Sequence, residues 1–187
     1  MVFQFIQMSE EKPLISVIVP THRRPQKLFN LLSSLAVQTL GTEKFEVIVV
    51  SSPGDDLSKV SEPSRFPYSL KFISVPEVEN AAGNVSRKRN LGASVSGGDW
   101  LAFTDDDCQV HEKWLENASF HFGENIGGIE GVTEISKDSP DTLTNKGLRR
   151  LAIPGGYQTC NIFYKKDLFQ KVGGFDETGF PWFLEDT

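Results

Sequence analysis

The sequence predicts an α/β domain built on a mostly parallel central sheet flanked by helices. Two observations predict it. Short apolar runs, the first of them rich in β-branched residues, alternate with helical patterns along the chain, and three consecutive aspartates, Asp105 to Asp107, directly follow one of these runs. Continuous apolar runs are typical of strands buried on both faces, and the strand–helix–strand order favours parallel pairing. Ligands of such sheets bind beyond the carboxyl ends of the strands, where these aspartates, here named the acidic triplet, would lie.

Four strands are expected before the acidic triplet ends. They cover residues 14–19, 45–50, 70–75 and 99–104. Pro20 stops the first of them, because proline has no N–H to continue a ladder. Two later segments, 126–135 and 152–164, have a partly extended pattern. The polar stretch 136–150 between them is expected to be a loop.

Four helices are expected between the strands. The first opens at Pro25 and ends before Gly41, since proline favours a first helical turn and glycine a helix end. Its apolar residues fall at helical spacing: Leu28, Leu31, Leu32 and Leu35. The other three helices are predicted over 84–96, 113–122 and 165–172.

Composition restricts the class of function. The chain has 187 residues, enough for one domain with a sizeable core, and 39% of them are hydrophobic. Lys and Arg total 19 and Asp and Glu total 25, which gives a formal charge of −6. Nonspecific binding of nucleic acid depends on neutralising phosphates with basic residues, so no nucleic-acid partner is expected. A small anionic ligand stays open, because a few basic side chains suffice for it.

The location of the protein is predicted from what its sequence lacks. No apolar run is long enough to cross a bilayer, and residues 1–13 form an N-terminal arm without the basic flank of a signal peptide. Two cysteines, Cys108 and Cys160, are too few for a disulfide scaffold, which favours free thiols in a reducing compartment. We expect a cytoplasmic protein that can associate peripherally with a membrane.

The acidic triplet is the main candidate for chemistry. Adjacent carboxylates repel one another, so a cation or several donors must compensate them. Mg²⁺ and Mn²⁺ take oxygen ligands, often one or two carboxylates together with substrate phosphates. Asp105 and Asp107 occupy alternate positions and would both face the site in an extended turn. A solvated acidic turn, or Asp107 as the cap of the next helix, is the alternative that spacing alone leaves open.

A basic run precedes the triplet on the predicted helix 84–96. Arg87, Lys88 and Arg89 would meet a diphosphate or offset the triplet, or they form an ordinary solvated helix face. The segment 89–92 reads Arg-Asn-Leu-Gly, and its small Gly92 lets a ligand or a strand approach the helix closely.

Five segments in this order resemble the motifs of one known family. They are Val17 to Pro25 (VIVPTHRRP), Ser34 to Thr39 (SLAVQT), Gly83 to Gly92 ending in RNLG, Ala102 to Asp107 (AFTDDD), and Val172 to Glu177 (VGGFDE) followed by Leu184 to Thr187 (LEDT). Over residues 14–187 the chain is similar to family 2 glycosyltransferases of the GT-A fold. The resemblance implies a Rossmann-like nucleotide-binding half plus a partial acceptor half, together one domain over residues 1–187.

The resemblance also implies roles on the donor side. The donor would be a nucleoside-diphosphate sugar, with Thr21 and Arg23 bordering the base and Arg89 the base or the diphosphate. Asp105 would contact the ribose and a water on the metal, and Asp107 would ligate the metal, Mn²⁺ or Mg²⁺. A divalent cation stabilises the negative charge that develops on a departing nucleoside diphosphate. Asp105 and Asp107, with Asp106 between them, resemble the metal-binding Asp-x-Asp motif of the family.

On the acceptor side the resemblance implies an inverting transfer to a carbohydrate or lipid-linked acceptor. Asp186 would be the general base that takes the proton of the acceptor hydroxyl. Glu185 and Trp182 would bind the acceptor. On local grounds alone, Glu185 and Asp186 are also the acidic first turn of a helix, and Trp182 is also a core residue.

Two features depart from the family pattern. The loop after the second strand usually carries an aspartate that reads the base, whereas here it begins Ser51-Ser52-Pro53-Gly54 and Asp55 comes later. The base is therefore not predicted. The chain also stops at Thr187, directly after the predicted general base Asp186, so we expect either that the acceptor-side region is truncated or that the protein is incomplete as a catalyst. We expect these 187 residues to bind the donor but to transfer the sugar weakly or not at all.

Two other functions stay open. A sugar-phosphate nucleotidyltransferase has a similar sheet and carboxylate-held Mg²⁺, but the segment after the first strand lacks the glycine-rich basic loop of such enzymes. A non-catalytic module that binds sugar nucleotides or carbohydrates is the other alternative. The sequence does not distinguish polysaccharide biosynthesis from assembly of lipopolysaccharide or glycoprotein.

Overall fold

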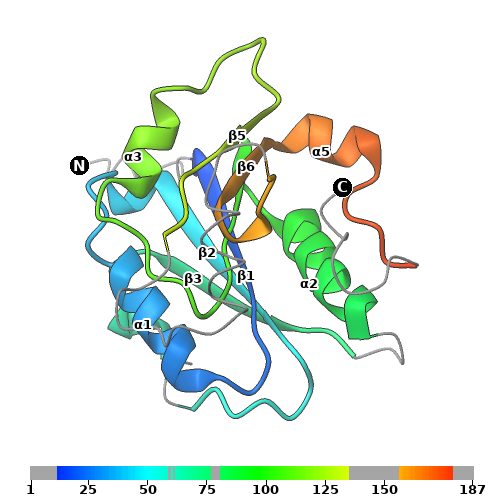
Figure 1. The fold of residues 1–187 in the computed structure, drawn as a ribbon. Coiled ribbons are helices and arrows are strands. Elements are labelled where there is room, and N and C mark those ends of the chain that lie inside the picture. Colours follow the sequence, from blue (N-terminus) through cyan, green and yellow to red (C-terminus); the bar gives the residue numbers. More distant parts are fainter. Residues whose placement is uncertain (1–11, 59, 61, 77–80, 135–155, 179–187) are drawn as a thin grey trace, which may run out of the picture.

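A computed structural model describes residues 12–58, 60, 62–76, 81–134 and 156–178 (Figure 1). Within these ranges the chain forms one six-stranded sheet in the order β3-β2-β1-β4-β6-β5. The strands are β1 (Ile15–Pro20), β2 (Phe45–Ser51), β3 (Ser69–Ser74), β4 (Trp100–Phe103), β5 (Gly128–Glu130) and β6 (Ile162–Lys165).

The first four strands are parallel, and the sheet changes direction at β6. The central strand β1 pairs in parallel with β2, where Val17 lies opposite Val47, and with β4, where Val17 lies opposite Ala102. β6 runs antiparallel to β4 and to β5. The prediction of a mostly parallel α/β sheet is therefore confirmed, with antiparallel pairing confined to its β6 side.

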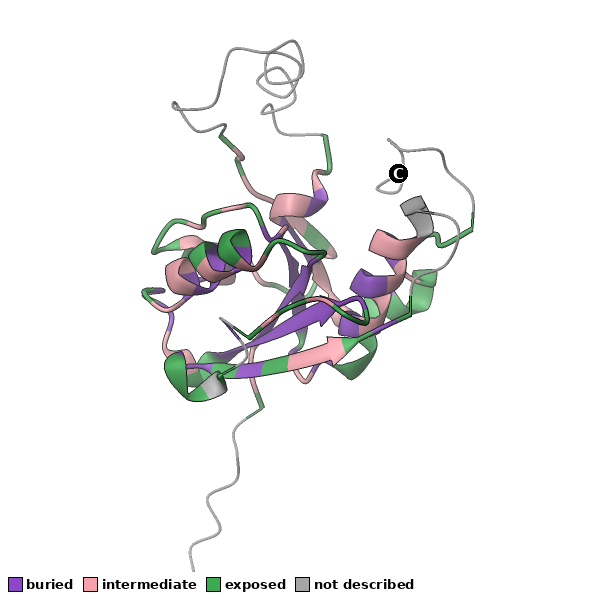
Figure 2. Ribbon diagram, turned by 90° about the horizontal axis from the view of Figure 1, so that it is seen from below, coloured by how far each residue is buried: buried purple, intermediate pink, exposed green. Residues whose placement is uncertain are grey.

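Helices cover both faces of the sheet (Figure 1). They are α1 (Pro25–Leu35), α2 (Ala81–Val95), α3 (Trp114–Ser119) and α5 (Lys166–Val172), with short 3-10 turns η1 (Thr42–Lys44), η2 (Pro63–Arg65) and η3 (Thr159–Asn161). α1 and α3 lie on one face, and α2 and α5 lie on the other. The central strands β1, β2 and β4 are wholly buried, whereas the outer strands β3 and β5 are partly exposed (Figure 2).

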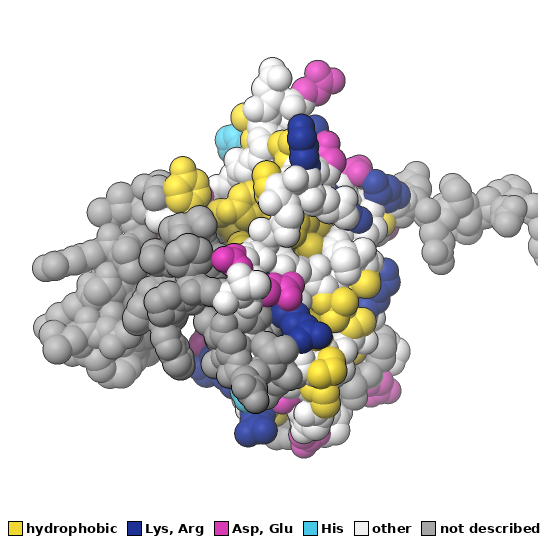
Figure 3. Space-filling view, turned by 90° about the vertical axis from the view of Figure 1, so that its right-hand side faces the viewer, with side chains coloured by type: hydrophobic (Ala, Val, Ile, Leu, Met, Phe, Trp, Pro, Cys, Tyr) yellow, Lys and Arg dark blue, Asp and Glu magenta, His cyan; other side chains and the backbone are white. Residues whose placement is uncertain are grey.

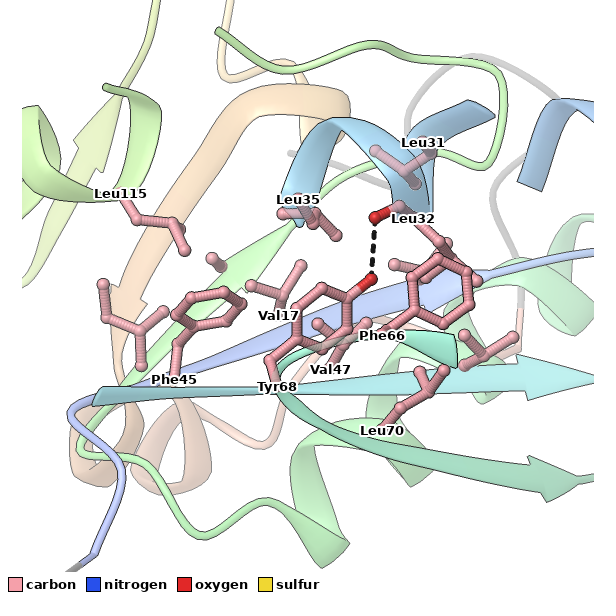
Figure 4. Close-up of a cluster of buried hydrophobic side chains, with 14 of the residues drawn as sticks. Val17, Leu31, Leu32, Leu35, Phe45, Val47, Phe66, Tyr68, Leu70 and Leu115 are labelled. Carbon is pink, nitrogen blue, oxygen red and sulfur yellow. Dashed lines mark hydrogen bonds between the residues drawn. The ribbon is translucent and has the colours of Figure 1, made fainter. Parts of the chain in front are cut away.

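The core on the α1 face explains why these segments fold as they do. Leucines at helical spacing on α1 pack on the odd-numbered residues of β1, including Val17, and on Val47 of β2 (Figure 4). Tyr68 is buried among them, and its hydroxyl donates a hydrogen bond of 2.8 Å to the carbonyl of Leu32. The polar end of the ring therefore has a partner, as buried tyrosines require.

Several predicted helices and strands are longer than the observed ones. α1 ends at Leu35 rather than near Gly41, because tertiary contacts take over beyond it: Gln38 Nε2 donates to the carbonyl of His111 at 2.8 Å, and the N–H of Thr39 donates to Glu112 at 2.8 Å. α3 ends at Ser119, and the described part of the extended segment predicted over 126–135, up to residue 134, forms a strand over Gly128–Glu130 alone. The predicted loop 136–150 lies outside the described residues.

Candidate functional site

The carboxyl ends of β1, β2 and β4 meet at one edge of the sheet, as the topology predicts. The N–H of Thr21, just after β1, donates to Val50 of β2 at 2.9 Å, and Thr104, just after β4, donates to Ile18 of β1 at 3.3 Å. The acidic triplet follows Thr104 directly. This edge therefore brings the triplet beside the segment that follows β1.

The middle carboxylate of the triplet is an internal anchor. Asp106 is fully buried, accepts a hydrogen bond of 2.7 Å from the hydroxyl of Thr21, and forms an ion pair with the guanidinium of Arg24. Burial raises the pKa of Asp106, as does the neighbouring charge of Asp107, while the contacts with Thr21 and Arg24 oppose that rise. Asp106 thus joins the loop after β4 to the loop after β1.

The outer two carboxylates of the triplet are accessible. The side chains of Asp105 and Asp107 are 33% and 38% exposed. Asp105 accepts from Arg89 Nη2 at 3.0 Å, whereas Asp107 lies 3.0 Å from Arg24 Nη1 and 3.3 Å from Lys27 Nζ. The backbone at the triplet is not extended, because the N–H of Cys108 donates to the carbonyl of Asp105 at 3.1 Å and closes a turn, yet the outer two carboxylates are both accessible. The alternative that Asp107 caps the next helix is wrong, because α3 begins at Trp114 with its cap at residue 113.

The basic run on α2 is mostly an interior feature. Lys88 and Arg89 are 4% and 2% exposed, so the interpretation as a solvated helix face is wrong for both. Lys88 Nζ donates to the carbonyl of Thr21 at 2.8 Å, and Arg89 reaches Asp105. Together they hold α2 against the ends of β1 and β4.

Gly92 lets α2 approach the sheet closely. A Cβ atom at this position would lie 2.6 Å from Cγ2 of Ile18 on β1 and 3.3 Å from Cγ2 of Val50 on β2. Of the two partners suggested by the sequence, a ligand or a strand, the described structure places a strand there. Close approach carries Lys88 and Arg89, one turn earlier, to the strand ends.

Asp55 clamps the loop after β2 onto the loop after β1. Its side chain is 2% exposed, and its oxygens accept from the backbone N–H groups of Arg23 at 3.2 Å and Ser52 at 3.0 Å. Arg23 has a left-handed φ of 53°, an uncommon conformation that this bond supports. Since both oxygens of Asp55 are engaged, it is a poor substitute for the base-reading aspartate of the family.

The donor set of the triplet fits a hard divalent cation that shares its coordination with a ligand. Asp105 and Asp107 offer accessible carboxylate oxygens, the ligand type that Mg²⁺ and Mn²⁺ prefer. No group of three or more metal-binding side chains occurs among the described residues. A site with two carboxylates leaves coordination positions for phosphate oxygens and water, so these residues would hold the cation weakly by themselves and more tightly together with a donor.

Arg24 and Lys27 were not assigned roles from the sequence. A signal was nevertheless present, because residues three apart at the start of a helix share one face. What the sequence did not show is that this face of α1 points at the triplet. The predicted residues Trp182, Glu185 and Asp186 lie outside the described residues.

A hollow separate from the triplet lies beside β5, β6 and α5. It encloses about 560 Å³, and its lining includes Ile129, Tyr164, Phe169 and Phe175. Figure 3 shows hydrophobic side chains exposed on this side of the molecule. None of the triplet aspartates lines this hollow, and its mainly apolar lining does not suit a hard cation.

The sequence matches the model of one protein family, glycosyl transferase family 2, over residues 16–173. The chain belongs to this family. Its curated relatives include the glycosyltransferase AglE of Haloferax volcanii, 27% identical over 90% of this chain, and an uncharacterized glycosyltransferase of Haemophilus influenzae, 31% identical over 86%. The family 2 chain spans 58% and 56% of their lengths.

Solved structures confirm the GT-A fold of this family 2 chain. Mannosyltransferase PcManGT from Pyrobaculum calidifontis, in complex with GDP-Man and Mn²⁺, superposes with a TM-score of 0.68 at 18% identity, over 89% of this chain and 48% of that protein. Staphylococcus aureus TarS 1-349 in complex with UDP-GlcNAc gives 0.65 at 21% identity, over 87% and 48%. Among the described helices of the family 2 chain, none has the length and apolarity to cross a membrane.

Proposed function

We propose that this chain is the donor-binding part of an inverting glycosyltransferase that uses a nucleoside-diphosphate sugar and a divalent cation. The observation that carries the proposal is the alternation in the acidic triplet. Asp106 is buried and fixed, while Asp105 and Asp107 keep accessible carboxylates at the edge where parallel sheets bind ligands. The relatives that were crystallised with UDP-GlcNAc or with GDP-Man and Mn²⁺ support it.

Each described residue of the donor side has a defined part in this proposal. Asp107, assisted by Asp105, holds the cation, which stabilises the charge of the departing nucleoside diphosphate. Arg89 orients Asp105 through their contact at 3.0 Å. Arg23 borders the base, and Thr21 supports that loop by fixing Asp106. We also propose that residues 1–187 belong to one domain; the predicted N-terminal arm lies, up to residue 11, outside the described residues.

On the acceptor side, we assign Asp186 as the general base, with Glu185 and Trp182 contacting a carbohydrate or lipid-linked acceptor. A carboxylate placed beside the acceptor hydroxyl takes its proton as the oxygen attacks the anomeric carbon, and attack opposite the leaving group inverts that carbon. The protein acts in the cytoplasm, in peripheral contact with a membrane if the acceptor is lipid-linked.

A thermal-shift screen of UDP, GDP and other nucleoside diphosphates, each with and without Mn²⁺, tests donor binding. We expect one base to raise the melting temperature only when Mn²⁺ is present. In Asp107→Ala this metal-dependent shift should disappear, whereas Glu124→Ala, which removes an exposed carboxylate elsewhere, should keep it. An unchanged metal-dependent shift in Asp107→Ala would rule out the metal assignment.

Hydrolysis of the sugar nucleotide by a longer chain tests catalysis separately. The anomeric configuration of the released sugar, followed by NMR, should be inverted relative to the donor. Asp186→Asn should abolish turnover and leave donor binding intact. Donor binding without any turnover in the unmodified longer chain would favour the non-catalytic binding module instead.

A further inference from the structure

The first turn of α1 has the wrong charge for a helix start. Helix N-termini carry a partial positive charge and favour acidic residues or capping side chains. α1 has Arg24 at its cap position and Lys27 in its first turn, with no acidic residue in that turn and no capping hydrogen bond from a side chain. Two cations at this end interact unfavourably with the partial positive charge of the helix N-terminus. The turn therefore needs anionic partners from outside the helix.

The partners are the last two carboxylates of the triplet, and the two cations use them differently. Arg24 is tied to the buried Asp106 as well as to Asp107, so it is part of the internal anchor. Lys27 is 56% exposed, and among the described residues its ion-pair partner is Asp107 at 3.3 Å. An exposed pair of this kind is weak, and a lysine on a flexible stem exchanges partners easily.

Asp107 cannot hold Lys27 and a divalent cation at full strength together, because the two cations repel each other. This competition for Asp107 rests on the proposed function. A metal ion that binds without a nucleotide must displace Lys27 from Asp107, and it gives the ammonium group no new anionic partner. A metal that arrives with a nucleoside diphosphate brings phosphate oxygens to the same carboxylate. The ammonium group then gains an anionic partner as it leaves Asp107.

We propose that Lys27 neutralises Asp107 before the donor binds and contacts the donor's diphosphate once the metal ion has replaced Lys27 at Asp107. The role couples the two binding events. Lys27 opposes binding of the metal alone and favours binding of metal and nucleotide together. It is a donor-binding residue with no part in the chemical step.

Isothermal titration calorimetry of Lys27→Met tests this coupling. Mn²⁺ alone should bind a few-fold tighter, about fivefold at most, because one weak competing ion pair is lost. UDP or GDP, titrated into protein saturated with Mn²⁺, should bind about tenfold or more weakly, because a charged contact to phosphate is lost. Lys27→Arg, which keeps the charge, should retain most of the coupling.

Lys113→Met is the matched control, since it removes an exposed lysine from the cap of α3 and changes the net charge equally. It should leave both affinities unchanged. The proposal is overturned if Lys27→Met, with a wild-type circular dichroism spectrum, binds Mn²⁺ no tighter and nucleotide no more weakly than wild type. If the wild type binds no nucleoside diphosphate with Mn²⁺, the proposed function fails. The titration with Mn²⁺ alone still decides whether Lys27 competes with the metal ion for Asp107.

Discussion

Asn90 of α2 and Phe175, just beyond α5, hold each other through a reciprocal pair of hydrogen bonds. The N–H of Phe175 donates to Asn90 Oδ1 at 2.9 Å, and Asn90 Nδ2 donates to the carbonyl of Phe175 at 2.8 Å. The guanidinium carbon of Arg89 lies over the ring of Phe175, 5.6 Å from the centre of the ring. Two motifs more than 80 residues apart therefore form one unit, which supports Arg89 where it meets Asp105.

We expect Asn90→Ala to destabilise the protein by about 2 kcal/mol, because two backbone groups of Phe175 lose their partners. Urea denaturation measures the change. Asn117→Ala, on the exposed face of α3, is the control and should shift the free energy of unfolding by less than about 0.5 kcal/mol. Equal stability of the two variants would show that the Asn90 bonds contribute nothing.

Gly92→Ala should cost about 1–3 kcal/mol, because the new Cβ would meet Ile18 at 2.6 Å and force α2 away from β1. Thermal unfolding measures this cost. Gly123→Ala is the matched control: its Cβ would have its nearest neighbour at 3.8 Å, so we expect little change. A melting temperature of Gly92→Ala at the wild-type value would contradict the close approach of α2 to the sheet.

Glu46 should make stability depend on pH. Burial alone would raise the pKa of this carboxyl, but hydrogen bonds from Lys71, the N–H of Gly97 and the hydroxyl of Ser16 outweigh burial and lower it below 4.5. A depressed pKa in the folded state means that the stability from Glu46 is present above the unfolded value and is lost as the pH falls through the folded value.

Glu46→Gln should therefore lower the free energy of unfolding by about 2 kcal/mol near neutral pH and flatten its fall in acid. Urea titrations across the acidic range measure both effects. Glu124→Gln, at an exposed position, should follow the wild-type curve. A variant whose pH dependence is as steep as that of the wild type would place the acid sensitivity elsewhere.

The two cysteines should differ in reactivity. The thiols of Cys108 and Cys160 influence each other's ionisation: the neighbouring Cys160 raises the pKa of Cys108, and the neighbouring Cys108 lowers the pKa of Cys160. Burial raises the pKa of Cys108 further. Because the thiolate is the reactive form, iodoacetamide should modify Cys160 first.

Mass spectrometry of the alkylated protein checks this order. Cys160→Ala should speed the modification of Cys108, because its pKa then falls. Thr133→Val, which removes the hydroxyl 3.7 Å from the Cys160 sulfur, should slow the modification of Cys160. Faster alkylation of Cys108 than of Cys160 in the wild type would reverse the assignment.

Local pattern predicted most of the fold and part of the site. The apolar runs identified β1, β2 and β4, and the leucine spacing identified α1, because both are set by which side chains are buried. Gly173 directly follows the predicted helix 165–172, and it closes α5 with a left-handed φ of 96°. The end of α1 was missed because contacts of Gln38 and Thr39 with a distant segment decide it.

The sequence by itself determined the family, the succession of strands along the chain up to β4 and the place of the acidic triplet after it, because strand periodicity and motif order are local properties of the chain. Only the tertiary structure decided which carboxylate is buried and which cation each one meets. Asp106 is buried because β1 and β4 are neighbours in the sheet, which brings Thr21 and Arg24 to it across more than 80 residues. Pairing between side chains depends on distances in space, and no spacing along the chain records those distances.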